Sequence, residues 1–168
     1  MITQVNPKTI LEYVWIGGKG EIRSKTRVIH KIISDVSMVP IWNYDGSSTE
    51  QATSNGITEV ILKPCLMVKD PLRRHQPQLC NCYVVLCDTY DENDVPLKTN
   101  KRHDANNMFN KNIEEEPWFG LEQEYFFIHP ENKEKIKDYG NLYYCGIVYD
   151  KNERIIVEKH MEACLYCN

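Results

Sequence analysis

The chain has 168 residues, of which 42% are hydrophobic and 26% charged, and its formal net charge is −4. This length fits one or two small domains, and the composition is that of a globular protein, which excludes a disordered or fibrous chain. Acidic and basic residues are interspersed, so we expect no basic surface for binding nucleic acid.

No targeting or membrane segment is expected from the sequence. The first residues, Met1–Lys8, contain no apolar run of signal-peptide length, and no stretch approaches the length of a membrane span. Seven cysteines in a chain without an export signal favour reduced thiols and a cytoplasmic location. Cys80 and Cys82 are too close in sequence for a normal zinc knuckle, and Cys164 and Cys167 fall on one face of a predicted helix, so we interpret both pairs as thiols in preference to zinc ligands.

The first hundred residues predict a small, strand-rich unit. Ile10–Ile16 is rich in β-branched and aromatic residues, Gly17–Gly20 predicts a turn, and Glu21–Ile29 predicts the partner strand of a hairpin. Val39–Trp42 leads into the Asp45-Gly46 turn. Thr58–Leu62 and Cys65–Val68 predict two short strands interrupted by Pro64, and Asn81–Tyr90 predicts a central strand.

The rest of the chain predicts helix, strand, strand and helix, with a domain boundary near Lys98–Arg102. Asp104–Asn112 predicts a short helix, and Arg154–Cys167 carries the clearest helical stripe. Strands are expected at Trp118–Tyr125 and around Tyr143–Gly146.

The acidic pair Glu122 and Glu124 lies inside the first of these strands. Residues two apart in a strand point to the same face, so their carboxylates would lie side by side. Such carboxylates repel each other unless they are protonated or bridged by a cation, and Mg²⁺ and Mn²⁺ prefer oxygen ligands of this kind. The alternative is a solvent-facing strand whose outer positions are acidic.

Several motifs, in order and at similar spacing, resemble those of one enzyme family. They are Trp42–Thr49 (WNYDGSST), Leu86–Tyr90 (LCDTY), Thr99–His103 (TNKRH), Trp118–Tyr125 (WFGLEQEY), Tyr143–Gly146 (YYCG), Ile156–His160 (IVEKH) and Ala163–Tyr166 (ACLY). The chain therefore resembles glutamine synthetase of the eukaryotic type.

The resemblance implies an α+β fold. Residues 1–100 would form a β-grasp N-terminal domain, and residues 101–168 the truncated start of the family's α/β catalytic domain. Members of the family run to roughly twice this length, a size at which chains split into several domains. From this comparison the chain is expected to lack most of the catalytic domain.

The resemblance also implies the chemistry, which is the ATP-dependent ligation of ammonia to glutamate through γ-glutamyl phosphate. Asp45 matches the residue that helps bind and deprotonate ammonium, reaching across a subunit interface, with Ser47 and Ser48 bracing its loop. Glu122 and Glu124 match two metal-ligating glutamates, so Mg²⁺ or Mn²⁺ and ATP are the implied cofactors. Without the resemblance, Asp45 would be interpreted as an ordinary Asp-Gly turn residue.

Some segments depart from the family pattern. Glu50 stands where a small residue is usual, Glu131–Asn141 is shorter and more charged, and Asn152–Arg154 replaces a Gly-Arg-Asp sequence. We therefore expect the isolated chain to be inactive. The alternatives are a non-catalytic module that docks on complete synthetase subunits in a homo- or hetero-oligomer, and a decayed or split gene product.

Overall fold

The structure is a computed structural model, and it describes residues 8–52, 56–74, 80–134 and 151–167. The chain divides near Glu115 into two compact units, the first containing the sheet and the second running from Glu116 to Leu165. Each unit is described by itself. Within the described ranges, no helix is both long and apolar enough to cross a membrane.

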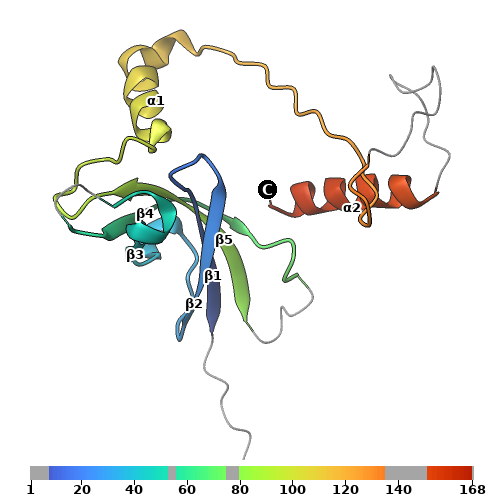
Figure 1. Cartoon of the computed structure of the whole chain (residues 1–168), viewed down its shortest axis with the longest axis horizontal. Helices are drawn as coiled ribbons and strands as arrows, with labels where there is room; N and C mark the ends of the chain where they lie inside the picture. The colour runs from blue at the N-terminus through green and yellow to red at the C-terminus, as the bar shows by residue number, and fades with distance from the viewer. Residues whose placement is uncertain (1–7, 53–55, 75–79, 135–150, 168) are drawn as a thin grey trace, which may run out of the picture. The chain divides into compact units, whose positions relative to one another are not determined.

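A mixed, twisted sheet of five strands forms the first unit (Figure 1). The strands are β1 (Thr9–Ile16), β2 (Ile22–Ile29), β3 (Trp42–Asp45), β4 (Glu59–Lys69) and β5 (Asn81–Tyr90). Their order in the sheet is β2-β1-β5-β4-β3, so the predicted central position of Asn81–Tyr90 is confirmed. β1 pairs with β5 in parallel, and the other neighbours are antiparallel.

The predicted β1–β2 hairpin is confirmed. The two strands pair antiparallel from Thr9↔Ile29 to Ile16↔Ile22, and Gly20 in the connecting turn has φ +81°. Along β1, every second residue is buried from Thr9 to Trp15, the two-residue period expected when one face of a strand packs on a core. The outer strand β2 has no buried residue.

The two short strands expected on either side of Pro64 are instead one strand, β4. The pairing of β4 with β5 shifts register between Pro64 and Leu66. Proline has no amide hydrogen to donate to the ladder, and a bulge lets the chain pass this position without ending the strand. The prediction of two strands was therefore wrong, because Pro64 produces an irregularity within one strand.

The core lies on one face of this sheet and is rich in aromatic side chains. Its buried members are Leu11, Tyr13, Trp15, Ile33, Val39, Leu62, Val85 and Cys87. Trp15 stacks on Tyr44 with ring centroids 4.5 Å apart, and Tyr13 meets Trp42 edge-on at 5.2 Å. These ring contacts hold β3, which ends at Asp45, against β1, although the two strands are not neighbours in the sheet.

The helix of the first unit, α1 (Lys101–Phe109), begins three residues before the predicted start and continues into a 3-10 segment, η3 (Asn110–Glu115). Asn100 explains the earlier start, because its side-chain oxygen accepts a hydrogen bond from the His103 amide at 3.2 Å and caps the helix. Met108 is 62% and Phe109 45% exposed, so much of the predicted apolar face is accessible.

The second unit contains the predicted helix, observed as α2 (Lys151–Cys167). Its apolar stripe is exposed, with Met161 50% and Leu165 73% accessible. The strand expected at Trp118–Tyr125 is not formed, since the structure assigns no strand to this stretch. A strand requires a hydrogen-bonded neighbour, and the partner expected around Tyr143–Gly146 lies outside the described residues.

Candidate functional site

The predicted turn residue Asp45 ends strand β3 and caps the 3-10 segment η2 (Gly46–Thr49). One carboxylate oxygen, Oδ1, accepts hydrogen bonds from the Ser47 amide at 2.9 Å and the Ser47 hydroxyl at 2.7 Å. These contacts confirm that local hydrogen bonds hold the carboxylate and that Ser47 braces the loop. The Asp45 side chain is exposed, so its carboxylate is fixed locally and accessible to a ligand.

The hydrogen bonds at Asp45 also determine its charge. The Ser47 hydroxyl, followed by the Ser47 amide, lowers the pKa of Asp45 below its ordinary value of 3.8. Donors to a carboxylate favour its ionised form. Asp45 is therefore an anion at neutral pH, suited to attract a cation or accept a proton.

Two close backbone approaches hold this turn against the sheet. The Gly18 amide donates to the Thr49 carbonyl at 2.9 Å, and the Gly46 amide donates to the Thr58 carbonyl at 2.6 Å. A methyl group added at Gly18 would lie 2.3 Å from the Thr49 oxygen, and one at Gly46 would lie 2.7 Å from a Val60 methyl carbon. The β1–β2 turn and the Asp45 turn thus contact each other through main chain, which requires glycine at both positions.

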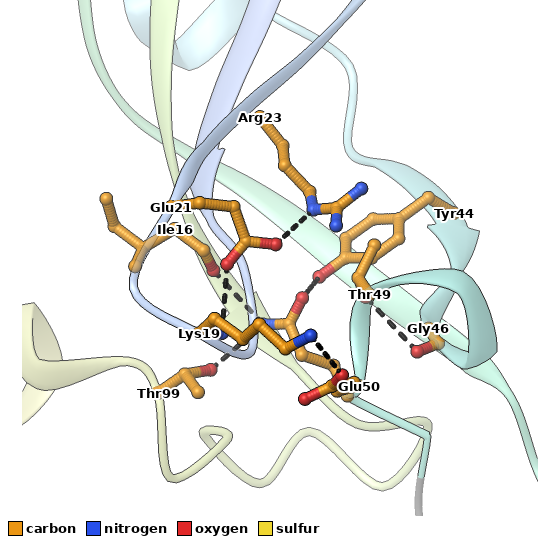
Figure 2. Close-up of polar contacts among 10 residues, drawn as sticks. Ile16, Lys19, Glu21, Arg23, Tyr44, Gly46, Thr49, Glu50 and Thr99 are labelled. Carbon is orange, nitrogen blue, oxygen red and sulfur yellow. Dashed lines mark hydrogen bonds and ion pairs between the residues drawn. The ribbon is translucent and has the colours of Figure 1, made fainter.

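Gln51 joins this turn to three other segments. Figure 2 labels its partners Ile16, Tyr44 and Thr99. Its side chain accepts a hydrogen bond from the Tyr44 hydroxyl at 2.6 Å, and it donates to the Ile16 carbonyl at 3.1 Å and the Thr99 hydroxyl at 2.9 Å. Gln51 is only 6% exposed. Sequence reasoning did not identify this residue, because nothing in a polar stretch distinguishes a buried glutamine from a solvated one.

Glu50 occupies a left-handed backbone position, with φ +59° and ψ +34°. This conformation favours glycine, which explains why a small residue is usual there. The Glu50 carboxylate pairs with the Lys19 ammonium at 2.7 Å, but both side chains are more than 60% exposed. An ion pair exposed to this degree contributes little stability.

The predicted metal ligands Glu122 and Glu124 are both exposed, in an extended stretch of the second unit. Their neighbours Gln123, Tyr125 and Phe127 line a hollow with residues of α2. The strand that would set the two glutamates side by side is not formed, so their common face stays a prediction. Across the described part of the chain, no three His, Cys, Asp or Glu side chains are arranged to hold a metal.

The comparisons with known proteins point to one kind of enzyme. Glutamine synthetase cytosolic isozyme 2 of Vitis vinifera is 44% identical over 176 residues, covering 98% of this chain and 48% of that protein. A glutamine synthetase nodule isozyme of Lupinus angustifolius is 42% identical over 98% of this chain and 54% of its own length. A protein of Acanthamoeba polyphaga mimivirus, which carries the glutamine synthetase name provisionally, is 48% identical over 94% of this chain and 46% of its own length.

Nearly the whole chain is glutamine synthetase-like sequence. No family model matches it. The chain spans about half the length of the curated glutamine synthetases that it matches. Asp45 lies in the first unit and the glutamate pair in the second.

Proposed function

We propose that the chain supplies the N-terminal half of a glutamine synthetase, which ligates ammonia to glutamate with ATP. The observation that carries the proposal is the similarity to glutamine synthetases over 94–98% of the chain. The five-stranded mixed sheet is compatible with a β-grasp domain at residues 1–100. Residues 101–168 would form the first part of the catalytic domain.

The proposed reaction has two steps: ATP phosphorylates the side-chain carboxylate of glutamate, and ammonia then displaces phosphate from the acyl phosphate. Asp45 would attract ammonium and accept its proton, a role that its exposed, ionised carboxylate supports. In the family this residue acts on the active site of a neighbouring subunit. An anchored turn suits that role, because a proton acceptor must be held in place to act efficiently.

Glu122 and Glu124 would hold Mg²⁺ or Mn²⁺. Exposed carboxylates fit the oxygen-ligand preference of these ions. When bound, the metal would neutralise phosphate charge during phosphoryl transfer. In the family each of these glutamates serves a different one of two metals, so each ion would keep one protein ligand here, and we expect metal affinity to depend on ligands supplied by the remaining part of a synthetase.

The proposed partners are glutamate, ammonia and ATP, together with complete synthetase subunits in a homo- or hetero-oligomer. The names of the Vitis vinifera and Arabidopsis thaliana relatives place those proteins in the cytosol, which supports a cytoplasmic location for this chain.

A chimera tests the proposal directly. This chain would replace the matching segment of the Vitis vinifera isozyme, and glutamine formation from ATP, glutamate and ammonia would be measured. We expect an active chimera whose activity is lost in Glu122→Ala and Glu124→Ala and partly restored by raising the Mn²⁺ concentration. Glu115→Ala, which changes another exposed carboxylate, is the matched control and should keep activity. An assembled chimera without activity contradicts the proposal.

A second candidate is a non-catalytic module that docks on complete synthetase subunits. The intact Asp45 turn favours it, because that turn would face a neighbouring subunit. Native mass spectrometry of the 168-residue chain mixed with a complete synthetase shows whether mixed oligomers form. If the activity of those oligomers does not require Glu122 or Glu124 of this chain, the module is favoured.

A further inference from the structure

Two cysteines of the first unit, Cys80 and Cys82, lie close enough to bind one ligand together. Their sulfur atoms are 3.6 Å apart, although no disulfide joins them. Cys80 immediately precedes β5 and Cys82 is its second residue, so the two side chains emerge on the same side of the strand. Both are partly exposed, which leaves the sulfur pair accessible from solvent.

The surroundings of the pair are basic. Among the described residues, three basic side chains and one carboxylate line the hollow beside the two thiols: Lys69, Arg73, Arg74 and Asp70. Arg73 is held in place, because one guanidinium nitrogen donates to Asp70 at 2.6 Å and another to Glu12 at 2.9 Å. Burial and the neighbouring Cys80 thiol raise the pKa of Cys82 to about 11, and the positive charge of Arg73 acts in the opposite direction.

The number of ligands restricts which metal the pair could take. A structural zinc site needs four protein ligands, and no third His, Cys, Asp or Glu joins this pair in the described structure. Hard cations prefer oxygen, whereas thiolates select soft cations such as Cu(I). Soft monovalent cations are satisfied by two sulfurs, the number that this site offers.

We propose that Cys80 and Cys82 form a two-coordinate site for a soft monovalent cation of the Cu(I) type. Each thiol releases one proton, two sulfur–metal bonds form, and no atom changes its oxidation state. The resulting bis-thiolate complex carries one net negative charge, which the basic side chains offset. With metal–sulfur bonds of roughly 2.3 Å, a linear bridge spans roughly 4.6 Å, so the sulfurs need to separate by only about 1 Å.

Binding at this site would also stabilise the sheet. The Asp70 amide donates to the Cys82 carbonyl at 3.0 Å, which connects the end of β4 to the start of β5. A cation held by Cys80 and Cys82 would fix the backbone on one side of this contact. We therefore expect the bound form to unfold at a higher temperature, because a ligand that binds only the folded state stabilises it.

The test uses the full, reduced chain and Ag(I), a redox-inert probe for Cu(I), titrated against a competing chelator under anaerobic conditions. We expect one tight equivalent, protection of Cys80 and Cys82 from alkylation by mass spectrometry, and a higher melting temperature. Cys80→Ser and Cys82→Ser should each lose the tight equivalent and the thermal shift, while melting normally without Ag(I). The double variant Cys164→Ser/Cys167→Ser removes the helical cysteine pair and should behave as the unmodified chain.

Two results would overturn the proposal. One is equal tight binding by the unmodified chain and the Cys80→Ser variant. The other is loss of the tight equivalent in the Cys164→Ser/Cys167→Ser variant, which would assign the binding to the helix. If the Cys80→Ser variant fails to fold, the proposal is still tested, because the alkylation pattern of the unmodified chain identifies which sulfurs are bound.

Discussion

Two turns of the first unit, at Asp35 and at Asp45, share the same local chemistry. In each, an exposed aspartate caps a 3-10 segment, and its Oδ1 accepts hydrogen bonds from the amide and hydroxyl of the serine two residues later. In each, the serine hydroxyl is the main cause of a lowered aspartate pKa. Yet only the Asp45 turn lies in a motif that resembles a catalytic one.

The difference between the two turns is how each is anchored. The η1 turn (Val36–Met38) that Asp35 caps is flanked by buried apolar residues, Ile33 and Val39. Hydrogen bonds near Asp35 lie outside the turn, where the Ile33 amide donates to the Thr9 hydroxyl and the Tyr13 hydroxyl to the Pro40 carbonyl. The Asp45 turn itself is held by hydrogen bonds from Gly18 and through Gln51. Because hydrogen bonds fix orientation as well as position, this direct anchoring would suit Asp45 to the role proposed for it.

The largest difference between the two turns is expected when each aspartate in turn is replaced by asparagine in the chimera with the Vitis vinifera isozyme. Asparagine keeps the oxygen that caps the turn but cannot accept a proton. Asp45→Asn should therefore lower the rate of glutamine formation by roughly 10²–10⁴-fold, the usual contribution of a general base. Asp35→Asn should leave the rate within about twofold. Equal losses in the two variants would remove the distinction between the turns.

Removal of the polar anchor should have the largest effect on stability. Gln51→Ala leaves the Tyr44 hydroxyl and the Ile16 carbonyl without this partner, at a cost of about 2–4 kcal/mol in the free energy of unfolding. Denaturant unfolding of the 168-residue chain measures this change. Asn43→Ala, which shortens an exposed side chain nearby, is the control and should cost under about 1 kcal/mol. A similar cost for both would show that Gln51 is not an anchor.

Substitutions at the residue after each aspartate, Gly46 and Val36, should differ by a smaller amount in their cost to stability. At Gly46, an added methyl group would lie 2.7 Å from a Val60 methyl carbon and 3.0 Å from the Thr58 carbonyl oxygen. We expect Gly46→Ala to destabilise the chain by about 1–3 kcal/mol through overpacking. Val36→Ala, at the matching position of the other turn, should cost about 1 kcal/mol or less. Thermal unfolding of both variants decides whether the second turn is the more tightly packed.

The smallest effect concerns pH. Ser47→Ala should raise the pKa of Asp45 towards 3.8, and Ser37→Ala should do the same for Asp35, because each removes the main donor. Since the folded pKa lies below the unfolded one, the stability from each carboxylate is present above the unfolded pKa and is lost as pH falls through the folded pKa. Carboxyl NMR titration of the two variants should show shifts of the same sign. A shift at only one aspartate would mean that the turns differ chemically after all.

The parts of this molecule that the sequence predicts are those governed by local patterns. β-branched and aromatic residues predicted β1, alternation predicted β2 and a nearly continuous apolar run predicted β5, while the Asp-Gly pair predicted the turn at Asp45, because these features depend on near neighbours. Gln51 was missed because its partners, Ile16 and Thr99, are distant in sequence. The strand expected at Trp118–Tyr125 failed for a related reason: a strand pattern specifies only one side of a hydrogen-bonded pair.

The parallel pairing of β1 with β5 has a consequence for how the protein is made. A ribosome releases β1 early, and the β1–β2 hairpin can form at once from residues that are close in sequence. The inner edge of β1 must wait for β5, which emerges only after most of the first unit has been synthesised. Contacts between segments so far apart in sequence slow folding. Until then the nascent chain presents an unpaired row of backbone N–H and C=O groups along β1, an edge on which another chain can pair.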